Sequence, residues 1–138
     1  MANAAKTRLL SFSTEDRPGL LAQITQALSK AKVNITALCA YKWDNTAYVD
    51  LSVDAPPAAK KELARMGFKV ETEDVITAEI PNKVGELDKV TSALAAAGID
   101  ISYMYGTASS GRTSTALFST SDNKAALKAL SAGAGKKK

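Results

Sequence analysis

The sequence predicts an α+β protein built from two similar units in tandem. Three observations lead to this prediction: an ordinary globular composition, an internal repeat, and the same order of helical and extended patterns in each copy. Hydrophobic residues make up 46% of the 138 residues and charged residues 23%, which is typical of a folded protein and not of a disordered one. The length allows one ordinary domain or two small ones.

The repeat is found by shifting the sequence by 66 residues. Residues 19–35 then align with residues 85–101 without a gap, and seven of these seventeen positions are identical. Leu51 and Leu117 keep the same spacing, which predicts connections of equal length in the two copies. A shared glycine, a shared apolar spacing and a shared strand start indicate a duplication. The identical positions of the first copy are Gly19, Leu21, Thr25, Ala27, Leu28, Ala31 and Ile35.

The first copy, residues 1–73, is predicted to contain four strands and two helices. Apolar residues spaced three or four apart place one helical face on Leu21, Ile24, Leu28 and Ala31. Pro56-Pro57 opens the second helix at 58–66, and Gly67 follows its end. Alternation in the third strand directs one set of side chains to the core. That set is Ala47, Val49, Leu51 and Val53, and the other strands are predicted at 7–13, 33–42 and 68–72.

The second copy, residues 74–138, repeats the pattern with strands at 75–80 and 99–107, a hairpin at Ser109-Ser110-Gly111 and a helix at 122–130. Its first helix carries apolar residues at the corresponding positions, and Gly98 is its predicted stop. These positions are Leu87, Val90, Leu94 and Ala97. No fourth strand is predicted, and residues 131–138 are expected to form a disordered tail.

The order βαββαβ followed by βαββα predicts two ferredoxin-like units with antiparallel sheets and both helices on one face. In this fold the fourth strand lies at the edge beside the first. The second unit lacks that strand, so the edge of residues 75–80 is expected to be open unless another segment covers it. An open edge favours self-association, and a homodimer is therefore predicted.

The absence of histidine and the presence of one cysteine exclude a His-based triad, a histidine metal site and a disulfide. No nucleophile–base pair is visible, so the protein is predicted not to be an enzyme and to use no cofactor and no metal. Cys39 lies in an apolar strand and is interpreted as a packed thiol. No apolar run is long enough to span a bilayer and no leader pattern opens the sequence, so a cytoplasmic protein without membrane partners is expected.

The net charge of +4 at pH 7 is concentrated at the carboxyl end. Lys136, Lys137 and Lys138 supply three of these charges, and the remaining sequence is close to neutral. Nucleic acid is therefore not the expected partner of the folded units. A nucleic-acid-associated protein that uses this basic tail is kept as the alternative function.

Two loops carry the strongest functional signal. The first reads Thr14-Glu15-Asp16-Arg17-Pro18-Gly19-Leu20-Leu21, with Asn34-Ile35 fifteen residues after the glycine. The second reads Asn82-Lys83-Val84-Gly85-Glu86-Leu87, with Asp100-Ile101 in the corresponding place. From about Leu9 to Leu130 the sequence resembles tandem ACT domains. It departs from their pattern at Asp16, where asparagine is usual, and in the second loop, which lacks the proline.

The resemblance implies a regulatory module that binds a small ligand, typically a free amino acid, where two ACT domains meet. It also implies an unidentified regulated partner protein. A glycine-centred loop that enters a helix can hold a carboxylate on free backbone N–H groups, and a nearby carboxylate or amide can bind an ammonium group. The candidate ligand residues are Asp16, Arg17, Pro18, Gly19, Leu20, Leu21, Asn34, Asn82, Lys83, Val84, Gly85, Glu86, Leu87 and Asp100.

Two pairings of the polar candidates remain open. Asp16 with Asn34, and Asn82 with Asp100, give one carboxylate and one amide in each site. Pairing across the repeats instead gives an acidic site from Asp16 and Asp100 and a neutral site from the two asparagines. A purely structural interpretation is equally open, because asparagine and aspartate favour turns, helix caps and strand starts.

Overall fold

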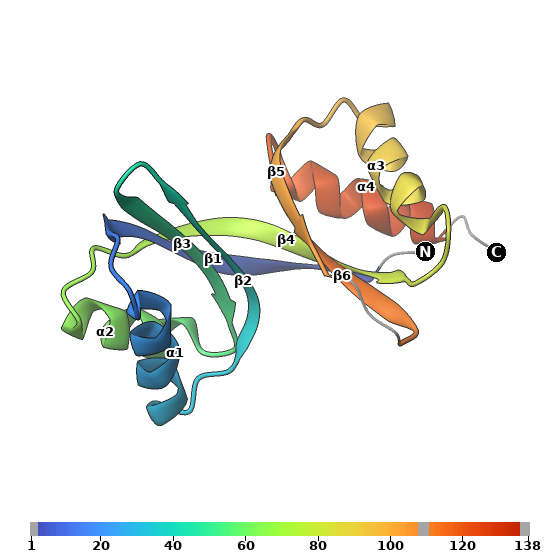
Figure 1. Ribbon diagram of the computed structural model, residues 1–138. Helices are drawn as coiled ribbons and strands as arrows, with labels where there is room; N and C mark the ends of the chain where they lie inside the picture. Colours follow the sequence, from blue (N-terminus) through green and yellow to red (C-terminus); the bar gives the residue numbers. More distant parts are fainter. Residues whose placement is uncertain (1–2, 108–110, 136–138) are drawn as a thin grey trace. The chain divides into compact units, whose positions relative to one another are not determined.

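The computed structural model describes residues 3–107 and 111–135 (Figure 1). The order strand, helix, strand, strand, helix occurs twice, as the sequence predicts. The first half contains β1 (Asn3–Glu15), α1 (Leu20–Lys30), β2 (Ile35–Trp43), β3 (Thr46–Val53) and α2 (Pro56–Arg65). The second half contains β4 (Glu71–Pro81), α3 (Glu86–Ala96), β5 (Ile101–Gly106), β6 (Thr113–Thr120) and α4 (Asn123–Gly135).

The chain divides into two compact units. The first unit holds residues 8–73, and the second holds residues 74–135 together with residues 3–7. Strands β1 and β4 each contribute residues to both units. Hydrogen-bonded strands follow the order β2-β3-β1-β4-β6-β5. Each unit therefore has the strand order of a ferredoxin-like sheet, β2-β3-β1-β4 in the first and β5-β6-β4-β1 in the second.

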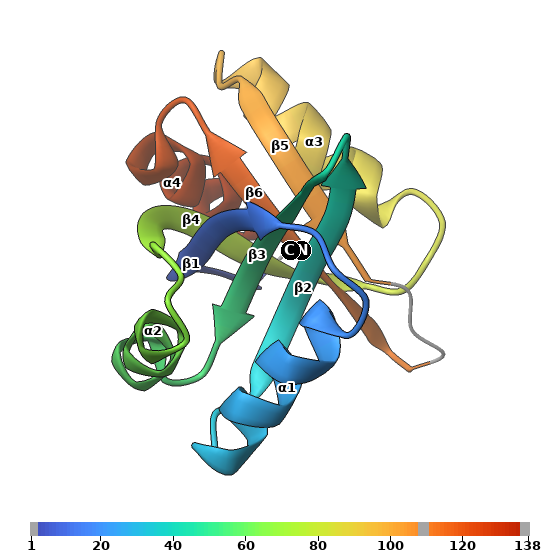
Figure 2. The same cartoon turned by 60° about the vertical axis from the view of Figure 1, so that its left-hand side comes forward.

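The core of the first unit lies between its sheet and its two helices. Figures 1 and 2 show α1 and α2 side by side on one face of β1, β2 and β3. The helices contribute a stripe of buried residues, and the strands contribute alternate residues as the pleat requires. These core residues include Leu20, Ile24, Leu28, Ala59, Leu63, Leu10, Phe12, Ala47, Val49, Leu51 and Val53. The predicted inward face of the third strand is thus confirmed.

The open edge expected in the second unit is occupied by the start of the chain. No strand follows α4 within the described residues. Instead, residues 3–7 take the place of a fourth strand next to β4, where Ala4 packs against the second core and Thr77 donates a hydrogen bond to the Ala5 carbonyl at 3.5 Å. Lys6 forms an ion pair with Asp74 at 3.4 Å. The edge of β4 is therefore not open, and it gives no reason to expect a homodimer.

The predicted strands at 68–72 and 75–80 are in fact one strand, β4. Residues 68–70 lie outside β4 because the chain at Phe68 is hydrogen-bonded to the end of α2. Gly67, with φ of 94°, turns the chain so that the Phe68 N–H donates to the Leu63 carbonyl at 3.2 Å. The Phe68 ring then stacks on Phe12 with 4.5 Å between ring centroids. Phe68 is thus a core residue of a helix-ending turn and not a strand residue.

The spacing of the repeat changes from 66 to 67 residues within the second hairpin. Leu10 pairs with Leu51 in the first unit, and the corresponding Ile76 pairs with Phe118, not with Leu117. The predicted match of Leu51 with Leu117, and the equal connections it implied, are therefore wrong by one residue. The extra residue lies between β5 and β6, a connection whose residues 108–110 lie outside the described part of the chain. The same shift relates the buried residues of α2 and α4, Ala59 with Ala126 and Leu63 with Leu130.

The predicted face of the first helix in each unit is confirmed at Ile24, Leu28, Val90 and Leu94 but differs at its first position. Leu21 and Leu87 are 40% and 45% exposed, and the buried positions are one residue earlier, at Leu20 and Glu86. Because α1 and α3 begin at these residues, the stripe runs through every fourth position from the helix start. Because Glu86 is polar, the apolar spacing of the sequence does not reveal that this first position is buried.

The last helix is longer than the sequence predicts. α4 continues through Gly135, and residues 136–138 of the expected tail lie outside the described residues. None of the helices described is long and apolar enough to cross a membrane.

Removal of residues 2–7 is predicted to open the edge of β4. We expect the midpoint of thermal unfolding to fall by about 5 °C or more, because a small unit loses one of its four strands, and we expect the exposed edge to promote self-association. Calorimetry and light scattering measure the two effects. Lys6→Ala is the matched control, since its solvent-exposed ion pair contributes little. An unchanged unfolding midpoint in the truncated protein would contradict the assignment of this segment as a strand of the second unit.

Candidate functional site

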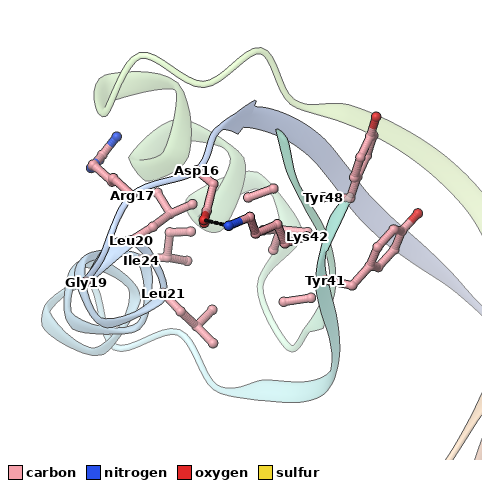
Figure 3. Close-up of a pocket in the computed structure, with 12 residues that line it drawn as sticks. Asp16, Arg17, Gly19, Leu20, Leu21, Ile24, Tyr41, Lys42 and Tyr48 are labelled. Atoms are coloured by element: carbon pink, nitrogen blue, oxygen red, sulfur yellow. Dashed lines mark ion pairs between the residues drawn. The ribbon is translucent and has the colours of Figure 1, made fainter. Parts of the chain in front are cut away.

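A cavity of about 270 Å³ lies in the first unit, where the loop after β1 meets α1 and the β2–β3 hairpin (Figure 3). Its floor is apolar and its charged groups come from the loop and from β2. The lining residues are Asp16, Arg17, Gly19, Leu20, Leu21, Ile24, Ala40, Tyr41, Lys42, Ala47, Tyr48 and Val49. Five of the predicted ligand residues are among them.

Asp16 and Lys42 provide opposite charges at this cavity. The Lys42 Nζ lies 3.5 Å from the Asp16 Oδ2, and their side chains are 59% and 33% exposed. The backbone fixes Asp16 in place, since its N–H donates to the Asn45 carbonyl in the hairpin turn at 2.9 Å. Figure 3 shows the two side chains meeting above the apolar residues, with Tyr41 and Tyr48 directed away from them. The rings of these tyrosines stack on each other, with 5.2 Å between centroids.

The start of α1 adds a set of hydrogen-bond donors to the cavity. Gly19 precedes the helix with φ of 83°, in the left-handed region that favours glycine, and no side chain caps the helix. The N–H of the first helical residue, Leu20, donates to the Arg17 carbonyl at 3.2 Å. The next N–H groups have no acceptor within the helix, and the helix dipole places partial positive charge there. The first turn of α1 contains no acidic residue. This end of the cavity is therefore suited to an anionic group.

A second, smaller cavity of about 180 Å³ occupies the equivalent place in the second unit. Most of its lining corresponds to that of the first cavity through the repeat. Asn82, Lys83 and Leu87 replace Asp16, Arg17 and Leu21, and Gly85 has the same left-handed conformation as Gly19, with φ of 88°. The remaining lining residues are Ile80, Pro81, Met104, Gly106, Thr107, Ser114, Thr115 and Ala116.

The polar groups of the second cavity are engaged differently. The Asn82 side chain donates from Nδ2 to the Gly111 carbonyl at 3.1 Å, and its backbone N–H donates to the Arg112 carbonyl at 2.8 Å. The first turn of α3 carries Glu86 and Asp88. Glu86 is buried and forms an ion pair with Lys89 at 2.8 Å.

Asn34 and Asp100 lie outside both cavities. Each residue forms hydrogen bonds that connect the start of the second strand of its unit to the residue that follows the third strand. The Asn34 N–H donates to the Asp54 side chain at 2.9 Å, and the Asp54 N–H donates to the Asn34 carbonyl at 3.0 Å. Asp100 exchanges equivalent bonds with Ser121. Their role as ligand residues, in either pairing, stays a prediction.

Of the other predicted ligand residues, some line a cavity and some lie outside both linings. The Arg17 side chain extends away from the charged pair in Figure 3 and donates to Gln23 Oε1 at 2.6 Å. Val84 is fully exposed, and the lining of the second cavity includes neither Gly85 nor Glu86. Pro18 is likewise absent from the lining of the first cavity.

Sequence reasoning missed Lys42 and the apolar floor of the first cavity. Of the floor residues, Leu20 and Leu21 are among the predicted ligand residues, whereas the sequence places Ile24, Ala47 and Val49 only in the core. Alternation along β2 and β3 places Lys42 on the face shared by Ala40, Ala47 and Val49. A search for charged residues across the hairpin from the loop could have found the lysine.

The described residues hold no group of three or more histidine, cysteine, aspartate and glutamate side chains placed to bind a metal ion. Lys136–Lys138, on which the nucleic-acid alternative depends, lie outside the described residues.

Comparison with known families identifies the first repeat. Residues 7–60 match the ACT domain. The first repeat is an ACT domain. The second repeat has the same order of elements and the same strand order, so the chain is a tandem of ACT-like units. A comparison with curated protein sequences gives no significant match.

Solved structures share the fold over nearly the whole chain. A protein from Bacteroides thetaiotaomicron is 29% identical, with a TM-score of 0.86, and the match covers 94% of this chain and 89% of that one. The ligand-free regulatory subunit of aspartate kinase from Thermus thermophilus is 16% identical, with a TM-score of 0.69 and coverage of 96% and 95%. Its counterpart from Thermus flavus is 17% identical, with a TM-score of 0.60 and the same coverage. At these identities the two aspartate kinase subunits show the fold alone.

Replacement of Gly19 by alanine is predicted to cost about 1–2 kcal/mol of unfolding free energy. A Cβ at this position meets no atom within 4 Å, so the cost arises from the left-handed backbone and not from a clash. Urea unfolding measures the change. Gly19→Asn is the matched control and should cost less, because asparagine tolerates this conformation better. Equal losses in the two variants would show that the backbone angle is not the cause.

Proposed function

We propose that this tandem ACT protein is a non-catalytic regulator that binds a free amino acid at the cavity beside α1. The observation that carries the proposal is the pairing of opposite charges at an uncapped helix start above an apolar floor. A free amino acid has one cationic end, one anionic end and a side chain. Asp16 would bind its ammonium group, and Lys42 with the N–H groups of α1 would bind its carboxylate.

The exposure of the Asp16–Lys42 pair supports this assignment. An ion pair in contact with solvent contributes at most about 1 kcal/mol, so a ligand that replaces it with two new ion pairs loses little. The backbone around Asp16 is already held by the hairpin turn. The site is therefore preorganised on one side and able to exchange partners on the other.

The regulatory output is proposed to be a change in association. The outermost strand of the first unit, β2, exposes Leu38, Tyr41 and Trp43, and Trp43 is 74% exposed. An apolar edge strand is a surface for pairing with a second chain. We propose that a homodimer forms through β2 and that ligand binding next to this strand alters the dimer or its contact with a regulated protein.

Ligand binding is tested by thermal unfolding with each of the twenty amino acids. A ligand present at one hundred times its dissociation constant should stabilise the protein by about 2.7 kcal/mol, which is a shift of several degrees. Trp43, the single tryptophan, adjoins Lys42 and provides a fluorescence titration. Asp16→Asn and Lys42→Met should each weaken binding at least tenfold, because each removes one ionic contact to the ligand.

Asn34→Ala tests whether the ligand binds in the cavity beside α1 or contacts Asn34, as the sequence predicted. Asn34 lies outside the cavity, so its variant should bind normally. Weakened binding in Asn34→Ala, with Asp16→Asn unaffected, would place the ligand elsewhere. A wild-type protein that none of the twenty amino acids stabilises would overturn the proposal.

The dimer is tested by light scattering at tens of micromolar protein. The wild-type protein should have twice the mass of one chain, and Leu38→Lys should shift it to a monomer by placing a charge on the paired edge. Val84→Lys is the control, because Val84 is fully exposed in the second unit. A monomeric wild-type protein would contradict this part of the proposal.

A further inference from the structure

The two equivalent cavities differ in charge, in helix start and in size. We infer that they have diverged: the cavity beside α1 binds an amino acid with an uncharged apolar side chain, and the cavity beside α3 binds no amino acid. The chain then takes up one ligand. This inference rests on the proposed function and adds the ligand's side-chain class and the stoichiometry.

The side-chain class follows from the floor of the first cavity. Below the Asp16–Lys42 pair, the side chains that line the cavity are aliphatic, from Leu20, Leu21, Ile24, Ala40, Ala47 and Val49. Leu20, Ile24, Ala47 and Val49 are also buried in the core. A charged ligand side chain placed on this floor would lose its hydration without a partner, whereas an aliphatic side chain is stabilised by the apolar area that it buries.

Among the described residues that line the second cavity, no charged pair corresponds to that of the first. Asn82 stands in place of Asp16, and its side-chain amide is held by the Gly111 carbonyl of the hairpin. In the sequence, Ala108 stands 66 residues after Lys42, at a position outside the described residues. An amide cannot supply the negative charge that an ammonium group needs, and the loop of the second cavity offers only the positive charge of Lys83.

The start of α3 is also unfavourable to a ligand carboxylate. Glu86 and Asp88 place two negative charges in its first turn, where α1 has none. Glu86 lies at the position of Leu20, at the positive end of the helix dipole, and pairs with Lys89. The second helix start is thus neutralised by the protein's own carboxylates. Its cavity is also smaller, about 180 Å³ against about 270 Å³.

Leu21 and Leu87 offer a matched pair of variants. They occupy the same position in the two cavities and are 40% and 45% exposed, so aspartate at either position should be tolerated by the fold. Isothermal titration of the intact protein with L-leucine should give one site per chain. Leu21→Asp should raise the dissociation constant at least tenfold, and Leu87→Asp should leave it within a factor of two.

Selectivity is measured with L-valine, L-lysine, L-glutamate and two truncated forms of leucine, 3-methylbutylamine and 4-methylpentanoate. Valine should bind within about tenfold of leucine, and the charged amino acids and both truncated forms should bind at least tenfold more weakly. Circular dichroism and the unfolding midpoint verify that each variant is folded. If Leu21→Asp is unfolded, Ala40→Asp on exposed β2 replaces it.

The outcomes separate the two proposals. Two sites per chain, equal weakening by Leu21→Asp and Leu87→Asp, or preference for lysine or glutamate would overturn this inference and leave the proposed function intact. Failure of all twenty amino acids to bind would overturn both. One site per chain, lost in Leu21→Asp and retained in Leu87→Asp, supports the divergence of the two cavities.

Discussion

The candidate site depends on one backbone conformation, the left-handed glycine that joins the first strand of each unit to its first helix. Gly19 and Gly85 have φ of 83° and 88°, a region that costs other residues about 1–2 kcal/mol. The turn lets the chain enter α1 or α3 without a side-chain cap. The N–H of the first helical residue, Leu20 or Glu86, donates to a loop carbonyl, and the next N–H groups have no acceptor within the helix. The loop, the helix start and the hairpin then enclose a cavity whose floor belongs to the core.

The duplication places this arrangement in the chain twice but does not keep its chemistry. Both units retain the glycine, the exposed leucine at the second position of the helix, and the backbone hydrogen bond from the loop to the hairpin. Asp16 of the first cavity is replaced by Asn82 in the second. The first turn of α3 also carries two acidic residues, where that of α1 has none. The shared features belong to the fold, whereas the proposed binding depends on those that differ.

Much of the fold could be predicted, because local patterns encode it. The helical spacing, the alternation in β3 and the order of elements were sufficient for the ferredoxin-like topology. Three features could not be found locally. The Phe68 N–H is hydrogen-bonded to the end of α2, so β4 begins only at Glu71. The extra residue of the second hairpin moves the partner of Ile76 to Phe118. Residues 3–7 form an edge strand of the second unit, a long-range pairing with no sequence signature.

In the candidate site, the loop, the glycine and Asp16 could be found from the sequence alone, because a glycine at a strand-to-helix junction is a local signal. Only the tertiary structure brought Lys42 to Asp16 and turned Leu21 away from the core into the cavity. It also placed Asn34 and Asp100 at the strand starts, beyond both cavities. Helix phase and hairpin pairing decide which side chains meet, and both depend on contacts between residues far apart in the chain.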